Sequence, residues 1–517
     1  MRKRNLFVLV SVLLMSIVLG SCSQSADYQS VIPAEPVIVV KANVDRLLTK
    51  SEVLQDNQVT GLLKTGINEM PENSRELMRG ILNDPANCGL DLKQPAFVVM
   101  DNIEQTRGFV LFAVKDIEKV KGLFGVVEEN NEDISLEENG DYYIVKSNNS
   151  NTVAFDNTKL IVAFAQGAFD ATEYITATEN GTKSDALKNF IASDNDVAYY
   201  MAYKDILRLA EGLSPETAGS IDTEQFENAK LICALSFEAG KIVMNSKLED
   251  ADELMAKSKE YLVNPNTDLQ EYFPAASYGY MQIGAKDMGT NIEENVPEAQ
   301  RPILDELLSS VNRELKKNGA DTEFTWSMLN SLDGTIAFGV SEADMAAALP
   351  LPQMTLIAEC QDKALFELIA ELLVANRIAS KSGEDTYSIM GMYNFAYVDN
   401  KMVAMPSNMF GQYCAGGSIK AMQENISENE MTNFIGNDNG MVIDIQAIAD
   451  MVEQMGLIKR NRDRAALNIL RNFTYSAYTI NEDLEFEWVT TFKDGSTNSL
   501  KQIKDMAVAG AINQSSF

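Results

Sequence analysis

The chain has 517 residues, with 43 Lys and Arg against 75 Asp and Glu, so its formal net charge is −32 near neutral pH. A protein this acidic repels phosphate backbones, which argues against nucleic acid as a partner. Histidine is absent, and this excludes Ser-His-Asp and Cys-His nucleophiles, HExxH zinc sites and His-ligated haem.

The first 21 residues have the pattern of a bacterial signal peptide. Three basic residues at positions 2–4 precede an apolar run, Leu6–Leu19. A helix of this length spans about 21 Å, which is too short for a hydrocarbon core of about 30 Å. The run therefore predicts a cleaved export signal rather than a membrane span.

The signal ends in Leu19-Gly20-Ser21-Cys22, which is the pattern of a bacterial lipobox. We expect cleavage after residue 21, lipid attachment to Cys22 and a short tether over residues 22–31. Because more than one acyl chain makes such an anchor stable, the membrane is one expected partner and the expected location is the cell envelope. Ser23 favours the outer membrane and leaves its periplasmic and surface faces both open. The alternative is an ordinary cleaved signal followed by a chance cysteine.

Landmarks of the mature chain recur at separations of 241 to 243 residues. They are Ile32-Pro33-Ala34 with Phe273-Pro274-Ala275, Val153–Asn157 with Ala396–Asn400, and the hairpins around Ala239-Gly240 and Asn481-Glu482. We therefore predict an internal duplication, with a first repeat over residues 32–262 and a second over residues 263–517. The boundary is expected near Asn264-Pro265-Asn266, because proline ends the preceding helix.

Each repeat has the pattern of an α+β domain in which antiparallel hairpins pack against helices. Thr386–Tyr397 and Lys401–Met405 are predicted strands joined by Asp399-Asn400, since Asp and Asn tolerate the positive φ of a tight turn. Apolar residues at helical spacing predict helices over Pro302–Lys317, Asp362–Ala379 and Gln446–Met455. Hairpins mixed with helices argue against a doubly wound parallel sheet.

Four cysteines follow Cys22, namely Cys88, Cys233, Cys360 and Cys414. None stands in C-x-x-C spacing, which argues against a zinc or thioredoxin-like site. Three full disulfide pairings are open in an oxidising envelope. Two of the cysteines, at 233 and 360, lie in strand-like segments, so free buried thiols are the favoured interpretation.

Two Asx-rich segments and one basic cluster are the remaining candidate sites. Asp194–Asp196 and Asn437–Gly440 resemble calcium loops, but both lack the spaced ligands and final Glu of an EF-hand. Turn chemistry ahead of a strand is the favoured interpretation. Lys459–Arg464 is favoured as a solvated helix entry over a docking patch. No residue is selected as catalytic, metal-binding or cofactor-binding, and no cofactor is expected.

A resemblance to a known family rests on four features of the chain. They are the lipobox, Ile32-Pro33-Ala34 followed by Val37–Val44, Leu47-Leu48-x-Lys50-Ser51, and Cys88-Gly89-Leu90-Asp91 with Pro95 opening a strand. Together they resemble the large lipoproteins of Bacteroidota that share a domain of unknown function. The resemblance covers most of the mature chain and implies an envelope lipoprotein with a duplicated α+β body. It supplies no catalytic residues.

Two hypotheses for function stay open. The first is a non-catalytic envelope protein that binds a small ligand or partner protein, or has a structural role, and it is favoured because the usual catalytic motifs are missing. The alternative is a carboxylate-dependent hydrolase, or a degenerate relative of one, since glycosidase chemistry needs only two acidic side chains. The functional surface is expected between the two repeats, where an apolar groove would favour binding.

Overall fold

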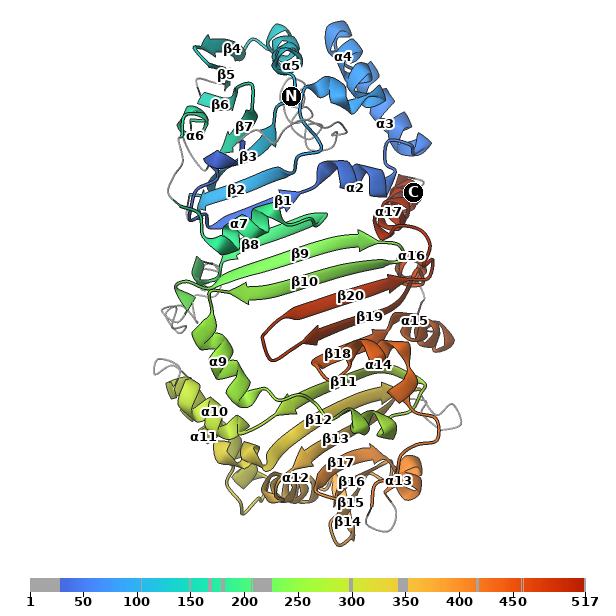
Figure 1. Cartoon of the computed structure of the whole chain (residues 1–517). Helices are drawn as coiled ribbons and strands as arrows, with labels where there is room; N and C mark the ends of the chain where they lie inside the picture. Colours follow the sequence, from blue (N-terminus) through green and yellow to red (C-terminus); the bar gives the residue numbers. More distant parts are fainter. Residues whose placement is uncertain are drawn as a thin grey trace. The chain divides into compact units, whose positions relative to one another are not determined.

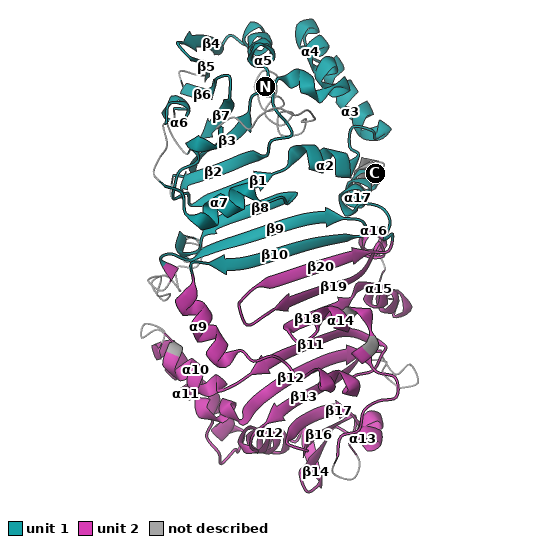
Figure 2. Cartoon of the chain, viewed as in Figure 1, with its two compact units in different colours: residues 1–210, 227–250, 494–517 teal, residues 211–226, 251–493 magenta. Residues whose placement is uncertain are grey.

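The computed structural model describes residues 28–515 apart from 104, 148–149, 166–169, 178–181, 206, 208–225, 297–300, 343–351, 415–417, 457 and 459. The chain divides into two compact units (Figure 2). The first holds residues 1–210, 227–250 and 494–517, and the second holds 211–226 and 251–493. The expected repeat bounds would place residues 251–262 in the first unit and residues 494–517 in the second. The structure instead has residues 251–262 in the second unit and residues 494–517 in the first.

The described strands of the first unit form an antiparallel sheet (Figure 1). They are β1 (Ile38–Ala42), β2 (Ala96–Asn102), β3 (Arg107–Ala113), β4 (Ile134–Asn139), β5 (Tyr142–Ser147), β6 (Ser150–Phe155), β7 (Lys159–Phe164), β8 (Val197–Ala202), β9 (Lys230–Glu238) and β10 (Lys241–Glu249). Their order across the sheet is β4-β5-β6-β7-β3-β2-β1-β8-β9-β10. The central strand β1 places Val39 opposite both Val99 and Tyr200.

Helices pack on this sheet, and their buried side chains form two apolar clusters with those of the strands. They are the 3-10 helices η1 (Tyr28–Val31) and η2 (Pro85–Cys88), and α2 (Val44–Ser51), α3 (Asn57–Asn68), α4 (Glu72–Asn83), α5 (Ile117–Glu129), α6 (Thr172–Ile175), α7 (Asp185–Ala192) and α17 (Ser499–Ser515). One cluster joins α4 and α5 through Met78 and Phe124. The other gathers Tyr28, Phe97 and Phe190 from η1, β2 and α7. Burying such side chains is the main stabilising term of a fold of this kind.

The described strands of the second unit also pair antiparallel. They are β11 (Ser277–Ala285), β12 (Leu332–Ser341), β13 (Gln353–Cys360), β14 (Ala379–Gly383), β15 (Thr386–Ile389), β16 (Tyr393–Val398), β17 (Lys401–Pro406), β18 (Asn439–Asp444), β19 (Phe473–Ile480) and β20 (Phe486–Phe492). Their order is β14-β15-β16-β17-β13-β12-β11-β18-β19-β20. The order of pairings therefore matches that of the first unit strand for strand.

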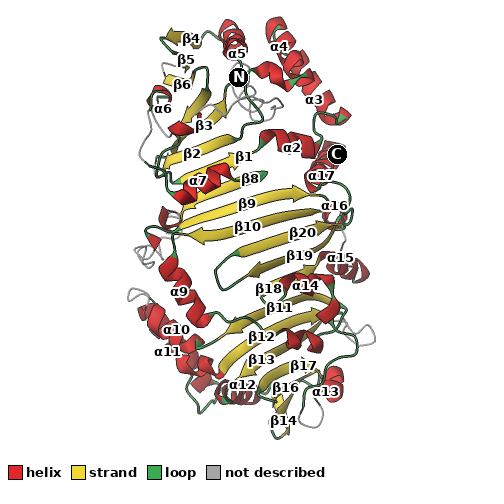
Figure 3. Cartoon of the chain, viewed as in Figure 1, coloured by secondary structure: helices red, strands yellow, loops and turns green. Residues whose placement is uncertain are grey.

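The second unit is covered by α9 (Asp252–Tyr261), η4 (Thr267–Tyr272), α10 (Met288–Asn295), α11 (Arg301–Lys317), η5 (Trp326–Ser331), α12 (Ala364–Ala375), α13 (Ser407–Tyr413), η7 (Ile426–Glu428), α14 (Glu430–Ile435), α15 (Ile445–Gln454) and α16 (Asn461–Leu470). Figure 3 shows α9, α10 and α11 gathered at one end of the strands. One core surrounds Phe273 and Tyr280, and another packs Phe366 of α12 on Phe395. Among the described residues, no helix has the length and apolar character needed to cross a bilayer.

The predicted α+β class with antiparallel hairpins is confirmed. Asp399 and Asn400 have φ of 50° and 55° and join β16 to β17 as predicted. The single predicted strand over Thr386–Tyr397 is wrong, because Met390 and Gly391 adopt φ of 51° and 73° and reverse the chain between β15 and β16. The helices predicted over 302–317 and 446–455 are confirmed as α11 and α15.

The helix predicted over Asp362–Ala379 ends early, at Ala375. Arg377 takes a left-handed φ of 58°, and Ala379 then begins β14. Both the helix and the strand bury apolar side chains, since Phe366 and Ala379 are buried. The apolar residues that predicted a helix therefore continue past Ala375, although the chain changes there from a helix to a strand.

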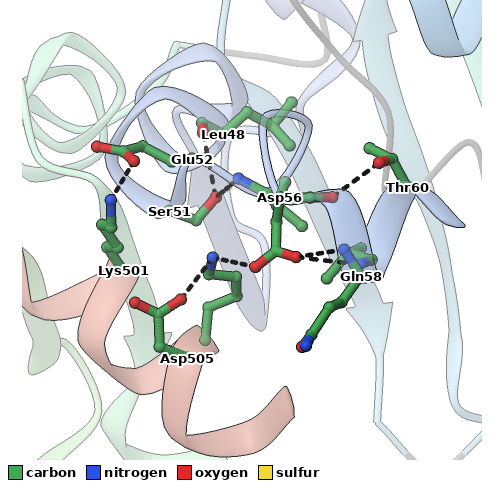
Figure 4. A network of polar contacts seen from close by, with 11 residues as sticks. Leu48, Ser51, Glu52, Asp56, Gln58, Thr60, Lys501 and Asp505 are labelled. Carbon is green, nitrogen blue, oxygen red and sulfur yellow. Dashed lines mark hydrogen bonds and ion pairs between the residues drawn. The ribbon is translucent and has the colours of Figure 1, made fainter. Parts of the chain in front are cut away.

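The C-terminal helix α17 is held on the first unit by ion pairs (Figure 4). Lys504 contacts Asp56 and Asp505, each at 2.6 Å, and Lys501 pairs with Glu52. Asp56 also caps α3, because its carboxylate accepts from the N–H groups of Gln58 and Val59 at 2.8 and 3.2 Å. One carboxylate therefore begins a helix and fastens another that is more than 400 residues away in the chain.

Replacing Asp56 by Asn keeps an oxygen for capping α3 and removes the charge that faces Lys504. Lys504 and two backbone N–H groups lower the pKa of Asp56 from its ordinary 3.8. The ionised carboxylate thus stabilises the fold above about pH 4, and this contribution is lost as the pH falls through the lowered pKa. We expect Asp56→Asn to unfold at lower urea concentration than the parent at neutral pH, and the gap to narrow as the pH falls through the lowered pKa.

Asp185→Asn is the matched control, because Asp185 lies in the first turn of α7 and its ion pair with Lys188 is exposed to solvent. Its urea midpoint should change little at either pH. A gap for Asp56→Asn that is equal at neutral and acid pH would contradict the role of the charge.

Candidate functional site

The predicted lipidation residue, Cys22, lies outside the described residues. The other four cysteines are described, and all are free, as favoured from the sequence. Cys233 lies in β9 and Cys360 in β13, which confirms their strand positions. Burial raises the pKa of Cys88 and Cys360, and it raises that of Cys414 to about 12. Such thiols stay protonated, so they are poor nucleophiles.

The segment Asp194–Asp196 lies in the short connection between α7 and β8, directly ahead of the strand. Asp194 pairs with Arg46 at 2.6 Å, on the surface. Asp196 is buried, and its carboxylate accepts from the backbone N–H of Phe237 at 2.7 Å and from Lys50 at 2.6 Å. These contacts hold the segment against β9 and α2, so both carboxylates have a structural role.

Asn437–Gly440 has the same place ahead of β18 in the second unit. The buried Asn439 accepts a hydrogen bond from the backbone N–H of Gly284 at 2.6 Å. Within the part of the chain that the structure describes, no group of three or more His, Cys, Asp or Glu side chains is arranged to hold a metal ion.

The basic cluster Lys459–Arg464 leads into α16, which begins at Asn461, so the predicted helix entry is confirmed. Lys459 itself and the side chain of Arg462 lie outside the described residues. The next described cation along the chain that has carboxylate partners is Arg471, which pairs with Asp450 at 3.3 Å and with Glu453.

A cavity of about 440 Å³ lies within the second unit, and we call it the α9 cavity. It is lined by α9, the end of β11, the start of α10 and the turn between β19 and β20. The lining residues are Leu254, Lys257, Ser258, Tyr261, Leu262, Ile283, Gly284, Ala285, Lys286, Met288, Asn291 and Leu484. Small-molecule sites in proteins commonly have this size and a mostly apolar lining with a few polar groups.

The sequence of α9 explains one wall of the α9 cavity. Leu254, Lys257, Ser258 and Tyr261 follow one another at the spacing that places residues on one face of a helix. Two contacts fasten α9 to the turn between β19 and β20. Ser258 donates to the carbonyl oxygen of Glu482 at 3.3 Å, and Lys259 pairs with Asp483 at 2.5 Å. Pro265 stands shortly after the helix ends at Tyr261, as predicted.

The floor of the α9 cavity depends on a glycine. The chain that leaves α9 crosses the end of β11 so closely that a Cβ on Gly284 would lie 1.9 Å from the carbonyl oxygen of Val263. Glycine is therefore required at this close approach. The residues on either side of Gly284 in the strand, Ile283 and Ala285, also line the cavity.

The charged groups of the α9 cavity are both cationic. Lys257 and Lys286 are exposed, and neither forms an ion pair with another described residue. No Asp or Glu stands among the described residues that line the cavity. The site therefore offers apolar surface, two ammonium groups and the polar side chains of Ser258 and Asn291, and it offers no carboxylate pair for hydrolysis.

Comparison with known proteins places the chain in a family. A family model described as a domain of unknown function (DUF4836) matches residues 28–500. The chain belongs to this family. The predicted resemblance to a family with a domain of unknown function is therefore confirmed, whereas the lipoprotein character and the link to Bacteroidota stay predictions.

Two further comparisons add little. The sequence matches no curated protein. Among solved structures, the chain is similar to that titled "Structure of crystal form IV of TP0453", with a TM-score of 0.27 and 8% sequence identity. The match covers 46% of this chain and 86% of the other. At this level the similarity supports no argument about function.

Sequence reasoning did not find the α9 cavity. The residues that line it come from three distant parts of the chain. In the sequence, the segment of α9 stands out only by the Asn264-Pro265-Asn266 that follows it. The apolar and polar residues spaced along Leu254–Tyr261 were the one signal available. That spacing is shared with any helix that packs on a sheet.

Gly284→Ala should destabilise the protein by roughly 1–3 kcal/mol, because the backbone of Val263 or of β11 must move. Gly61→Ala is the matched control, since a Cβ there meets nothing within 4 Å and Gly61 lies inside α3. That change should stabilise by about 1 kcal/mol at most. Urea unfolding of both variants measures the difference, and equal effects would contradict the close approach.

Proposed function

We propose that the protein is a non-catalytic envelope lipoprotein that binds a small, largely apolar molecule in the α9 cavity. The observation that carries the proposal is the cavity itself, about 440 Å³ in volume and lined mainly by aliphatic and aromatic side chains. The proposal rests on the second unit alone. The hydrolase alternative has no comparable support in this cavity. A glycosidase needs two facing carboxylates, and no Asp or Glu stands among the described residues that line the α9 cavity.

Filling the α9 cavity tests this function. Ile283→Trp adds a large ring at a lining position where the native side chain is 38% exposed, so the sheet can keep its structure. The neutral dye Nile red, whose fluorescence rises in apolar surroundings, is the probe. We expect saturable binding by the parent and affinity lower by about tenfold or more in the variant, which corresponds to about 1.4 kcal/mol.

Val98→Trp is the matched control, because Val98 is also a strand residue with 38% exposure and lies on β2 in the first unit. It should bind Nile red like the parent. Thermal unfolding of each variant checks that the fold is retained. If Ile283→Trp binds the dye as tightly as Val98→Trp does, the α9 cavity is not the binding site.

We also propose that Cys22 anchors this body in a membrane of the cell envelope, with the outer membrane favoured. The support comes from the signal pattern and lipobox of residues 1–22. The partners proposed are the membrane, through the anchor, and either a small ligand or an envelope protein. The strongly negative net charge continues to argue against nucleic acid.

Cys22→Ala should release the protein from the membrane, because the thiol that carries the lipid is lost. Partition between detergent-rich and aqueous phases measures this change. We expect the parent in the detergent phase and the variant in the aqueous phase. Cys88→Ala, which removes a buried thiol, should partition like the parent. A Cys22→Ala variant that stays in the detergent phase would show that something else holds the protein there.

We further propose that residues 32–262 and 263–517 arose by duplication of one α+β repeat. The support is the identical order of strand pairings in the two units and the register of their central strands. Val39 lies opposite Tyr200, and Tyr280 lies opposite Val442. The separations between matching residues, 241 and 242, agree with those of the sequence landmarks. In this view α9 and α17 are equivalent, since they follow β10 and β20.

A further inference from the structure

We infer that the ligand of the α9 cavity is an anionic amphiphile, with one aliphatic chain and a carboxylate-type head group. This inference rests on the proposed function and adds the class of ligand to it. The aliphatic chain would pack on Leu254, Leu262, Ile283, Met288 and Leu484. The head group would lie at the opening, between the ammonium groups of Lys257 and Lys286.

The first argument is the charge of the cavity lining compared with that of the whole chain. Acidic residues outnumber basic ones by 75 to 43 in this chain, yet the charged lining groups are the two lysines and no described carboxylate joins them. An apolar ligand without charge would gain nothing from two cations beside it. A carboxylate gains hydrogen bonds and charge attraction from both.

The second argument is the contrast between α9 and α17, which serves as an internal control. Lys504 is the sixth residue of α17 and Lys257 is the sixth residue of α9. Lys504 is largely buried and pairs with Asp56 and Asp505, each at 2.6 Å. Lys257 has no ion-pair partner among the described residues, although its neighbour Lys259 pairs with Asp483. The structure of α9 therefore does not require a charge at Lys257.

The third argument concerns solvent. Lys257 and Lys286 are exposed, whereas the lining residue Ala285 is buried and the leucine side chains of the lining are half-buried. An amphiphile can therefore place its chain in the apolar part and keep its head group partly hydrated. This avoids the cost of burying an ion without water. The aliphatic stems of the two lysines extend the apolar wall toward the opening, as long basic side chains do at interfaces.

The experiment uses the full chain and displacement of Nile red by two ligands with equal chains, dodecanoate and 1-dodecanol. We expect dodecanoate to bind the parent at least about fivefold more tightly than the alcohol. The preference should shrink as salt is added, because exposed charges are screened. In the double variant Lys257→Gln, Lys286→Gln dodecanoate should lose at least about fivefold more affinity than 1-dodecanol does, so that the preference disappears.

Two further variants complete the test. Lys257→Arg, Lys286→Arg keeps both charges and should keep the preference. Lys316→Gln removes an exposed lysine of α11 that does not line the cavity, and it should also keep the preference. If the Gln variant binds both ligands like the parent, or loses affinity for both ligands equally, the lysines do not recognise a head group.

The outcomes separate this inference from the proposed function. If the parent binds both ligands equally, the α9 cavity is an apolar site and the head-group inference is wrong. If neither ligand displaces the dye, and the dye itself binds Ile283→Trp normally, the proposed function fails as well. A preference that persists in the Gln variant would overturn the assignment of Lys257 and Lys286.

Discussion

The structure of the second unit depends on the pairing of β11 with a strand on each side. β11 lies between β12 and β18, so strands that follow it by about 50 and 160 residues meet on either side of it. The buried side chain of Gln282 supports this arrangement. It donates to the carbonyl oxygens of Gly436 and Asp438, both at 2.9 Å, and accepts from the Tyr280 hydroxyl and from Gln270, both at 3.1 Å. A buried amide satisfied on both ends fixes a single arrangement of its neighbours.

The same interaction places the candidate site. The ladder between β11 and β18 ends at Gln282, opposite Gly440. Beyond it the side chain of Asn439, rather than another backbone group, accepts from the N–H of Gly284. The last residues of β11 therefore pair with β12 on one side, and on the other side, past the end of the β18 ladder, Ile283–Lys286 line the cavity. The constraint that completes the sheet also frees the residues that would contact a ligand.

In the first unit a lysine occupies the position that Gln282 has in the second. Lys41 lies in β1, is buried, and donates to the carbonyl oxygens of Ile191 and Ser193 in the segment before β8. Burial lowers the pKa of Lys41 to about 8, which shows the cost of this cation in an apolar setting. The neighbouring turn also contains charges, because Asp196 pairs with Lys50. Under the proposed duplication, one repeat holds the turn with ions and the other with amides.

The sequence predicted those turns and helix ends that depend on the conformational preferences of one or two residues. The turn at Asp399-Asn400 was predictable because both residues tolerate positive φ, and the end of α9 because proline follows it. The turn at Met390-Gly391 was not, since methionine rarely adopts φ of 51° and the pairing of β15 with β16 that accompanies this turn depends on the fold. Nor could the sequence show that α17 packs on α2 or that α9 leaves a cavity beside β11, because those outcomes depend on residues that only the fold brings together.

The difference between α9 and α17 connects the architecture to function. The two helices follow equivalent hairpins, yet α17 is fastened to the first unit by Lys501 and Lys504, and the cations are answered by Glu52 and Asp56. Among the described residues, the ion pair of α9 with the rest of the second unit is that of Lys259 with Asp483, on the side of the turn between β19 and β20. The cavity side of α9 instead presents Lys257 over apolar residues. A repeat that needed only stability would gain from pairing this lysine as well. A cation that has no ion-pair partner among the described residues, beside an apolar cavity, is instead what a site for an anionic amphiphile needs.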